Sequence, residues 1–151
     1  MPTNADHKLP LFNIKTKVSV LTGSGTFTPS PGCFALDVKM VGAGAGGASA
    51  SSDGTNGACG GGGGAGGYLE KFISEPSASY SYQVGVGGQG QDPSVAVRVR
   101  SEGGGDTSLT DGTLTLLCEG GKGALKDAMN PGWNQFDCGQ GGNAVWQLHA
   151  V

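Results

Sequence analysis

The sequence predicts an all-β fold in which short strands alternate with glycine-rich tracts. Several segments alternate apolar and polar residues with a period of two, which is the pattern of a strand with one buried face. No segment keeps the 3.6-residue period of an amphipathic helix. Glycine accounts for 31 of the 151 residues and gathers beside the strand-like segments. Short strands at this spacing, separated by turn residues, are typical of a β-sandwich.

The strands expected in the first part of the chain are bounded by glycine and proline. Alternation and β-branched residues over residues 9–21 predict one or two strands, and residues 26–28 predict a short strand between turns at 23–25 and 29–32. The clearest strand covers residues 33–41. One of its faces is expected to be buried, and it carries Phe34, Leu36, Val38 and Met40.

The later strands follow the same rule. Asp111-Gly112 is a hairpin dipeptide and predicts a tight turn between two neighbouring strands. A single helical turn is the expectation for residues 124–129, ahead of Pro131. The strands expected after the longest glycine tract are residues 68–73, 79–86, 95–99, 107–110, 113–118 and 144–151.

The longest glycine tract covers residues 42–67 and consists mainly of glycine, alanine and serine. From Gly54 a glycine falls on every third residue, at Gly54, Gly57, Gly60, Gly63 and Gly66. Three residues per turn is the period of a polyproline-II helix, so one face of such a helix would carry no side chain. A flexible Gly/Ser linker is the alternative, because ordering glycine costs much backbone entropy.

Glycine tracts recur along the chain, and this favours an ordered structure over a linker. Bare-faced helices can approach each other closely, with N–H groups donating to carbonyls of neighbouring helices. We therefore predict that the tracts pack as a bundle bonded through the main chain. The further tracts are residues 85–90, 103–105, 120–123 and 139–142.

Composition excludes several classes of function. The net charge of −3 and the 14% content of charged residues provide no basic surface for nucleic acid or anionic membranes. Apolar residues make up 36% of the chain, and no run is long enough to cross a bilayer, so no membrane insertion is expected. Residues 1–12 lack the basic and apolar regions of a secretory signal, so synthesis in a cell's cytoplasm is expected.

The four cysteines do not form a metal motif. Cys33, Cys59, Cys118 and Cys138 contain no C-x-x-C pair and have no histidines at zinc-site spacing. Free thiols are the default interpretation, and one disulfide of undefined pairing is the alternative.

None of the short catalytic or cofactor motifs in this sequence has the neighbouring elements that its function requires. Residues 42–47 contain G-x-G-x-x-G after a strand, but neither a helix nor a suitably placed acidic residue follows. His7 and His149 lie near opposite ends of the chain. The aspartates all adjoin turn residues, which fits turn capping better than paired acid–base catalysis. We therefore expect no enzymatic activity, no cofactor and no metal; the aspartates considered are Asp53, Asp92, Asp106, Asp111 and Asp127.

Three aromatic residues near the C-terminus are candidate contacts for a receptor or partner. Trp133, Phe136 and Trp146 lie among polar and glycine residues, and aromatic side chains are enriched in binding hot spots. The alternative is that they fill the core or a subunit interface.

The order of the elements resembles a known family. The segments TGSGTFTPSPG, LDVKMVGAGAGG, GGGGGAGGYLEKFI, YSYQVGVGGQG and GGGDTSLTDGTLTLLCEGGKG follow one another over residues 20–123. This layout resembles the glycine-rich domain of many bacteriophage tail-fibre proteins, and is also similar to the glycine-rich region of the anaplastic lymphoma kinase receptor. The resemblance implies a jelly-roll β-sandwich whose inter-strand loops are packed glycine helices, at the receptor-facing part of a trimeric fibre.

The function expected from this resemblance is that of a non-enzymatic bacteriophage virion protein. It would be a homotrimeric tail-fibre, spike or tail component in the virion, with other virion proteins and a host surface receptor as partners. Residues 1–19 would form an attachment segment and residues 20–151 the glycine-rich domain. The long shaft of a complete tail fibre is missing from these 151 residues. A capsid decoration protein and a cellular glycine-rich structural or ligand-binding protein are the alternatives.

Overall fold

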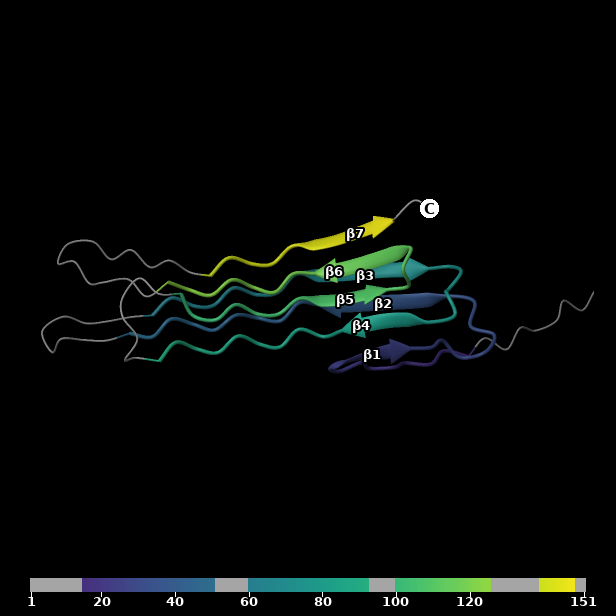
Figure 1. The fold of residues 1–151 in the computed structure, drawn as a ribbon, viewed down its shortest axis with the longest axis horizontal. Helices are drawn as coiled ribbons and strands as arrows, with labels where there is room; N and C mark the ends of the chain where they lie inside the picture. The colour runs from purple at the N-terminus through teal and green to yellow at the C-terminus, as the bar shows by residue number, and fades with distance from the viewer. Residues whose placement is uncertain (1–14, 51–59, 93–99, 126–138, 149–151) are drawn as a thin grey trace, which may run out of the picture.

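The structure, a computed structural model, describes residues 15–50, 60–92, 100–125 and 139–148, and these ranges contain strands but no helix. The predicted all-β class is confirmed (Figure 1). One antiparallel sheet has the order β1-β4-β5-β6-β7, and a second antiparallel sheet pairs β2 with β3. The strands are β1 (Ser24–Phe27), β2 (Leu36–Val41), β3 (Tyr68–Ile73), β4 (Tyr80–Gln83), β5 (Thr107–Thr110), β6 (Leu114–Cys118) and β7 (Ala144–Leu148).

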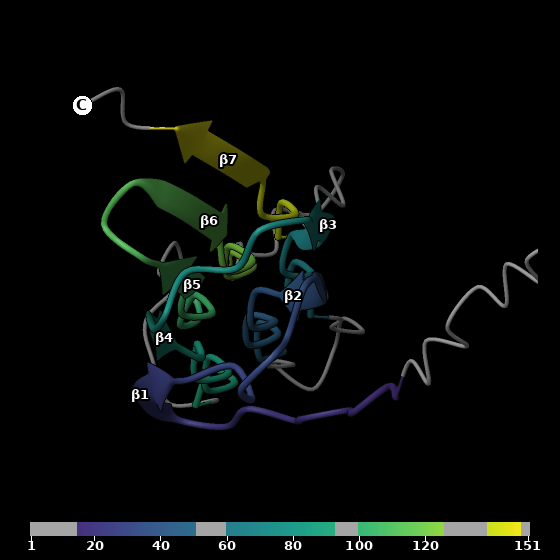
Figure 2. The same cartoon turned by 90° about the vertical axis from the view of Figure 1, so that its right-hand side faces the viewer.

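The hydrophobic core lies between the two sheets. Met40 of β2 and Leu69 of β3 face the larger sheet, whose strands contribute Tyr80, Leu109, Leu116 and Cys118. Figure 2 shows the strands end-on, with β2 and β3 opposite the curved row from β1 to β7. This small core joins the two layers as a sandwich.

The hairpin predicted at Asp111-Gly112 is present between β5 and β6. Gly112 has a φ of +93°, a conformation that glycine adopts without strain. Asp111 Oδ1 accepts hydrogen bonds from the N–H groups of Thr113 and Leu114, at 2.9 and 2.7 Å. Its Oδ2 accepts a 2.5 Å bond from Ser77 Oγ, which ties this hairpin to the turn before β4. These contacts, the Ser77 bond first, lower the pKa of Asp111.

Other strand predictions need correction. Residues 15–21, expected to be part of a strand, form none, because they have no neighbouring strand to pair with. The strand predicted from residue 33 begins at Leu36: Cys33 N–H donates to Ser30 O in a turn, and Phe34 is 64% exposed rather than buried. The turn predicted at 23–25 ends earlier, because β1 begins at Ser24.

Two further predictions fall wholly or mainly outside the described residues. The strand at 95–99 lies outside them, as does most of the helical turn at 124–129. Of that turn, Leu125 is described and bridges to Arg100, while Ala124 O accepts a bond from Ser101 N–H. The start of the predicted turn is therefore paired with a neighbouring segment and is not helical.

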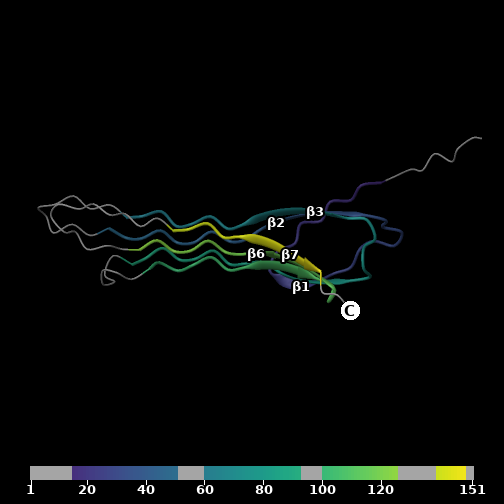
Figure 3. The same ribbon diagram turned by 90° about the horizontal axis from the view of Figure 1, so that it is seen from above.

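Six glycine-rich tracts extend from one end of the sandwich, and we call them together the glycine bundle (Figures 1 and 3). The tracts come in pairs, and each pair extends two neighbouring strands beyond the end of their sheet. The tracts are residues 42–49 after β2, 60–67 before β3, 84–91 after β4, 100–106 before β5, 119–124 after β6 and 139–143 before β7.

Main-chain hydrogen bonds join these tracts, and they recur every third residue. The central tract, 42–49, donates from Gly42, Ala45 and Ala48 to carbonyls of tract 60–67, at 2.8 to 2.9 Å. Its Ala43 and Gly46 donate instead to tract 100–106. The same tract accepts bonds from tracts 84–91 and 119–124. Period-three bonding in several directions is what helices with three residues per turn allow.

Glycine is required where the tracts approach each other. A Cβ built on Gly60, Gly63 or Gly66 would lie closer than 3.0 Å to a carbonyl oxygen of tract 42–49. Their spacing of three places all of them on the face turned to that tract. Gly54 and Gly57, which the sequence assigns to the same face, lie outside the described residues. Gly62 differs, because a Cβ there would meet nothing within 4 Å.

The first prediction compares two adjacent glycines of one tract. Gly63→Ala should lower the free energy of unfolding by about 1 to 3 kcal/mol, because its Cβ would overlap the Ala45 and Gly46 carbonyl oxygens. Gly62→Ala is the matched control, and it should be neutral or stabilising by up to about 1 kcal/mol, through the unfolded chain. Thermal and urea unfolding measure both. Equal stability of the two variants would contradict the packed bundle.

The second prediction concerns pH. The pKa of Asp111 lies below its ordinary value of 3.8, so its stabilisation is present above about pH 3.8 and is lost as the pH falls through the lowered pKa. Asp111→Ala should therefore lower the free energy of unfolding by about 1 kcal/mol at pH 7, and by less at pH values under the lowered pKa. Urea unfolding across this range is the measurement. Glu75→Ala, on the exposed turn after β3, is the control, and a pH-independent deficit in Asp111→Ala would rule out the charge effect.

Candidate functional site

The first candidate surface is the end of the glycine bundle away from the sheets, which we call the loop end. The chain leaves the described bundle after residues 50, 92 and 125 and returns at residues 60, 100 and 139. All these points lie at the same end (Figures 1 and 3). Three segments of the chain therefore begin and finish on one support.

Side-chain hydrogen bonds fasten the tracts near the loop end. Ser49 Oγ donates to Asp92 O at 3.2 Å, which joins the tracts that leave the bundle there. Ser101 is buried and donates from Oγ to Gly46 O at 2.5 Å. Arg100 Nη1 donates to Gly123 O at 2.9 Å. These bonds add to the main-chain bonds where the segments attach.

The second candidate surface is the exposed face of the β2–β3 sheet, which we call the outer face. Alternation along both strands directs one set of side chains to the core and the other to the surface. The register pairs Val41 with Tyr68, and Lys39 with Glu70. The outer face consists of Asp37, Lys39, Val41, Tyr68, Glu70 and Phe72, all of them exposed.

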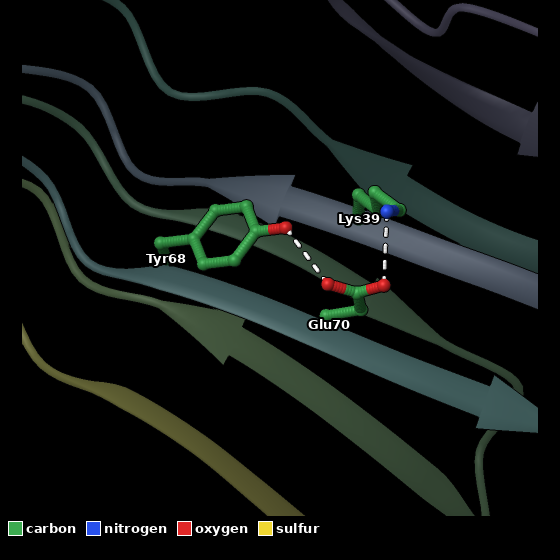
Figure 4. A network of polar contacts seen from close by, with 3 residues as sticks. All are labelled: Lys39, Tyr68 and Glu70. Carbon is green, nitrogen blue, oxygen red and sulfur yellow. Dashed lines mark hydrogen bonds and ion pairs between the residues drawn. The ribbon is translucent and has the colours of Figure 1, made fainter.

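A small polar network lies at the centre of the outer face (Figure 4). Lys39 Nζ and Glu70 Oε1 form an ion pair at 2.9 Å, and Tyr68 OH donates to Glu70 Oε2 at 3.1 Å. The hydrogen bond with Glu70 raises the pKa of Lys39, and the same bond lowers the pKa of Glu70. Partial desolvation, followed by the bond to Glu70, raises the pKa of Tyr68. Since the network is exposed, it contributes little to stability.

The described residues of these surfaces are already engaged with one another or lack the grouping that a metal site needs. Both Glu70 oxygens are occupied by neighbours, and no group of three or more His, Cys, Asp or Glu residues in the described part of the chain could hold a metal ion. Within the same residues, no helix has the length and apolar character needed to cross a membrane.

The aromatic residues singled out from the sequence are only partly described. Trp133 and Phe136 lie outside the described residues. The main chain of Trp146 lies in β7, opposite Leu116 in the register.

The structure describes some of the cysteines and aspartates that were considered from the sequence. Cys33 and Cys118 are free thiols, and burial raises the pKa of Cys118. Asp111 caps its hairpin as predicted, whereas Asp106 caps no turn: its Oδ1 accepts a 2.8 Å bond from Gly120 N–H in a neighbouring tract. The candidates outside the described residues are His7, Asp53, Cys59, Asp127, Cys138 and His149.

Sequence reasoning did not single out the outer face. Its signal is the period of two in residues 68–73, which places Tyr68, Glu70 and Phe72 together on one side. Two aromatic residues on the exposed face of a strand are the feature that could have found it.

Comparison with known families decides where this chain belongs. The family model described as a glycine-rich domain matches residues 19–149. The chain belongs to the glycine-rich domain family. That match covers the sandwich strands together with all six tracts of the glycine bundle. Neither the curated proteins nor the solved structures contain a match.

The third prediction tests the polar network. The negative charge of Glu70 disfavours the tyrosinate, so Glu70→Gln should lower the pKa of Tyr68. Spectrophotometric titration of the three tyrosines measures this change, and Tyr68→Phe identifies which transition belongs to Tyr68. Glu75→Gln is the control and should leave the titration unchanged. An unchanged Tyr68 transition in Glu70→Gln would contradict the network.

Proposed function

We propose that this protein is a bacteriophage virion protein, a tail-fibre, spike or tail-associated component that binds a host surface receptor through its loop end. The observation that carries the proposal is the attachment of three chain segments to one end of a bundle bonded through its main chain. Binding residues are commonly found on loops that a rigid scaffold positions.

In this proposal the glycine bundle is the support, and the chain segments attached at the loop end form the binding surface. The described bundle is joined by main-chain bonds and by close contacts at glycine. In this proposal it is the support on which the connecting segments vary in sequence. The segment between residues 125 and 139 contains Trp133 and Phe136, residue types enriched in binding hot spots.

The sequence resemblance supports the proposed setting. The order of glycine tracts and strands resembles the glycine-rich domain of bacteriophage tail-fibre proteins, and the family match covers the same region. The proposal includes a homotrimer in the virion, with other virion proteins and a host receptor as partners and with no enzymatic step.

The fourth prediction concerns adhesion. Trp133→Ala should lower binding of the labelled protein to cells of the host bacterium, with an unchanged melting temperature, because it removes an aromatic anchor. Phe34→Ala is the control: Phe34 is 64% exposed and lies before β2, at the opposite end of the molecule from the loop end. Cell binding measured by flow cytometry compares the variants.

Two results would count against the proposal. Unchanged binding in Trp133→Ala and Phe136→Ala would remove these residues from a receptor site, and loss of folding would assign them a structural role. Mass spectrometry of purified virions tests the setting separately, and absence of the protein from virions would reject it.

A further inference from the structure

The N-terminal arm, residues 15–22, has the sequence of a strand but no partner. Thr16, Val18 and Val20 alternate with Lys15, Lys17 and Ser19. No main-chain hydrogen bond joins the arm to another described residue, and its one side-chain bond runs from Lys17 Nζ to Ser30 Oγ at 3.4 Å. Val18 and Val20 are 83% and 85% exposed. Figure 2 shows the arm in purple, running from β1 across the molecule beneath β2 before it leaves the two sheets.

The edge of β2 that faces away from β3 has no partner strand among the described residues, so it could accept a strand such as the arm. The β2–β3 sheet contains only two strands, and a two-stranded sheet is marginal by itself. Gly42 N–H donates to Gly67 O, and this pair continues the β2–β3 register beyond Val41 and Tyr68.

The register identifies which main-chain groups of β2 are exposed at this edge. Hydrogen-bonded and non-hydrogen-bonded pairs alternate in an antiparallel ladder. Because Gly42 bonds toward β3, the N–H and C=O groups of Asp37, Lys39 and Val41 point away from β3. None of these three residues has a main-chain bond to another described residue on that side. Such a row is a template for pairing with another strand.

Charge agrees with this edge of β2 as the place where the arm binds. Lys39 is neutralised by Glu70, whereas Asp37 has no hydrogen bond or ion pair with another described residue. Lys15 and Lys17 of the arm are suited to that carboxylate. With these lysines on the side of the outer face, beside Asp37, the alternation of the arm places Val18 and Val20 on the opposite side of the added strand.

We propose that residues 15–20 of a second copy of this chain add as a strand to the free edge of β2. The added strand satisfies the main-chain groups of Asp37, Lys39 and Val41 and converts the two-stranded sheet to three strands. It places alternate arm residues beside the outer face. The contact is heterologous, and it is satisfied in every copy when the copies form a closed ring in which each arm reaches the next subunit. The inference concerns this contact and does not depend on a place in a virion.

Hydrogen–deuterium exchange of the full-length protein tests the contact directly. The amides of residues 15–20 and of Asp37, Lys39 and Val41 should be protected at high micromolar protein concentration and should lose protection on dilution. Absence of protection at the high concentration would overturn the proposal. Protection that does not change on dilution would also overturn it, because the arm would then pair within its own chain.

Matched variants test the same contact by molecular mass. Val20→Glu and Val18→Pro should shift the protein to a single-chain mass in light scattering, with the melting temperature of the dilute protein unchanged. The control is Val86→Glu, because Val86 is 78% exposed and lies in the glycine bundle, away from the arm. The proposal fails if the arm variants keep the mass of the parent, if the parent itself has a single-chain mass, or if only Val86→Glu dissociates it.

Discussion

The main-chain hydrogen bonds between glycine tracts are the constraint on which the rest of this structure depends. Each tract pairs with two or more others, and the central tract, residues 42–49, is bonded to four. Bonds at this spacing require tracts so close that a Cβ would overlap a carbonyl oxygen at many positions, including Gly46, Gly64 and Gly121. The bundle therefore obtains most of its order from main-chain groups, and side-chain bonds such as that from Ser101 Oγ to Gly46 O add to them.

The bundle and the sandwich stabilise each other because each tract is the direct continuation of a strand. The β2–β3 register passes directly into the bond from Gly42 to Gly67, and the β5 and β6 strands pass into tracts that are bonded through Gly104 and Gly121. The small core of Met40, Leu69, Leu116 and their neighbours holds the strands in order at one end. That order sets which tracts are adjacent, and the bonded tracts in turn hold the strand ends together.

The two candidate surfaces lie on different parts of the molecule, one on the bundle and one on the sandwich. The bundle supports the three segments of the loop end, where the proposed receptor binding is located. The sandwich end carries the outer face and the unpaired edge of β2, where the proposed contact between copies is located. The proposed receptor binding and the proposed contact between copies thus lie at opposite ends of the molecule.

Local sequence determined the elements of this protein, while tertiary structure decided their partners. Strand-like segments between turn residues predicted β3 and β5 at their observed bounds, and Asp111-Gly112 predicted the hairpin, because these patterns act over a few residues. The spacing of Gly60, Gly63 and Gly66 identified one bare face, but identical glycines carry no information about which tract lies against it. The exposure of Phe34, the unpaired arm and the outer face likewise depend on which strands are neighbours. That choice is made by residues far apart in sequence, as when Met40 meets Cys118 across the core.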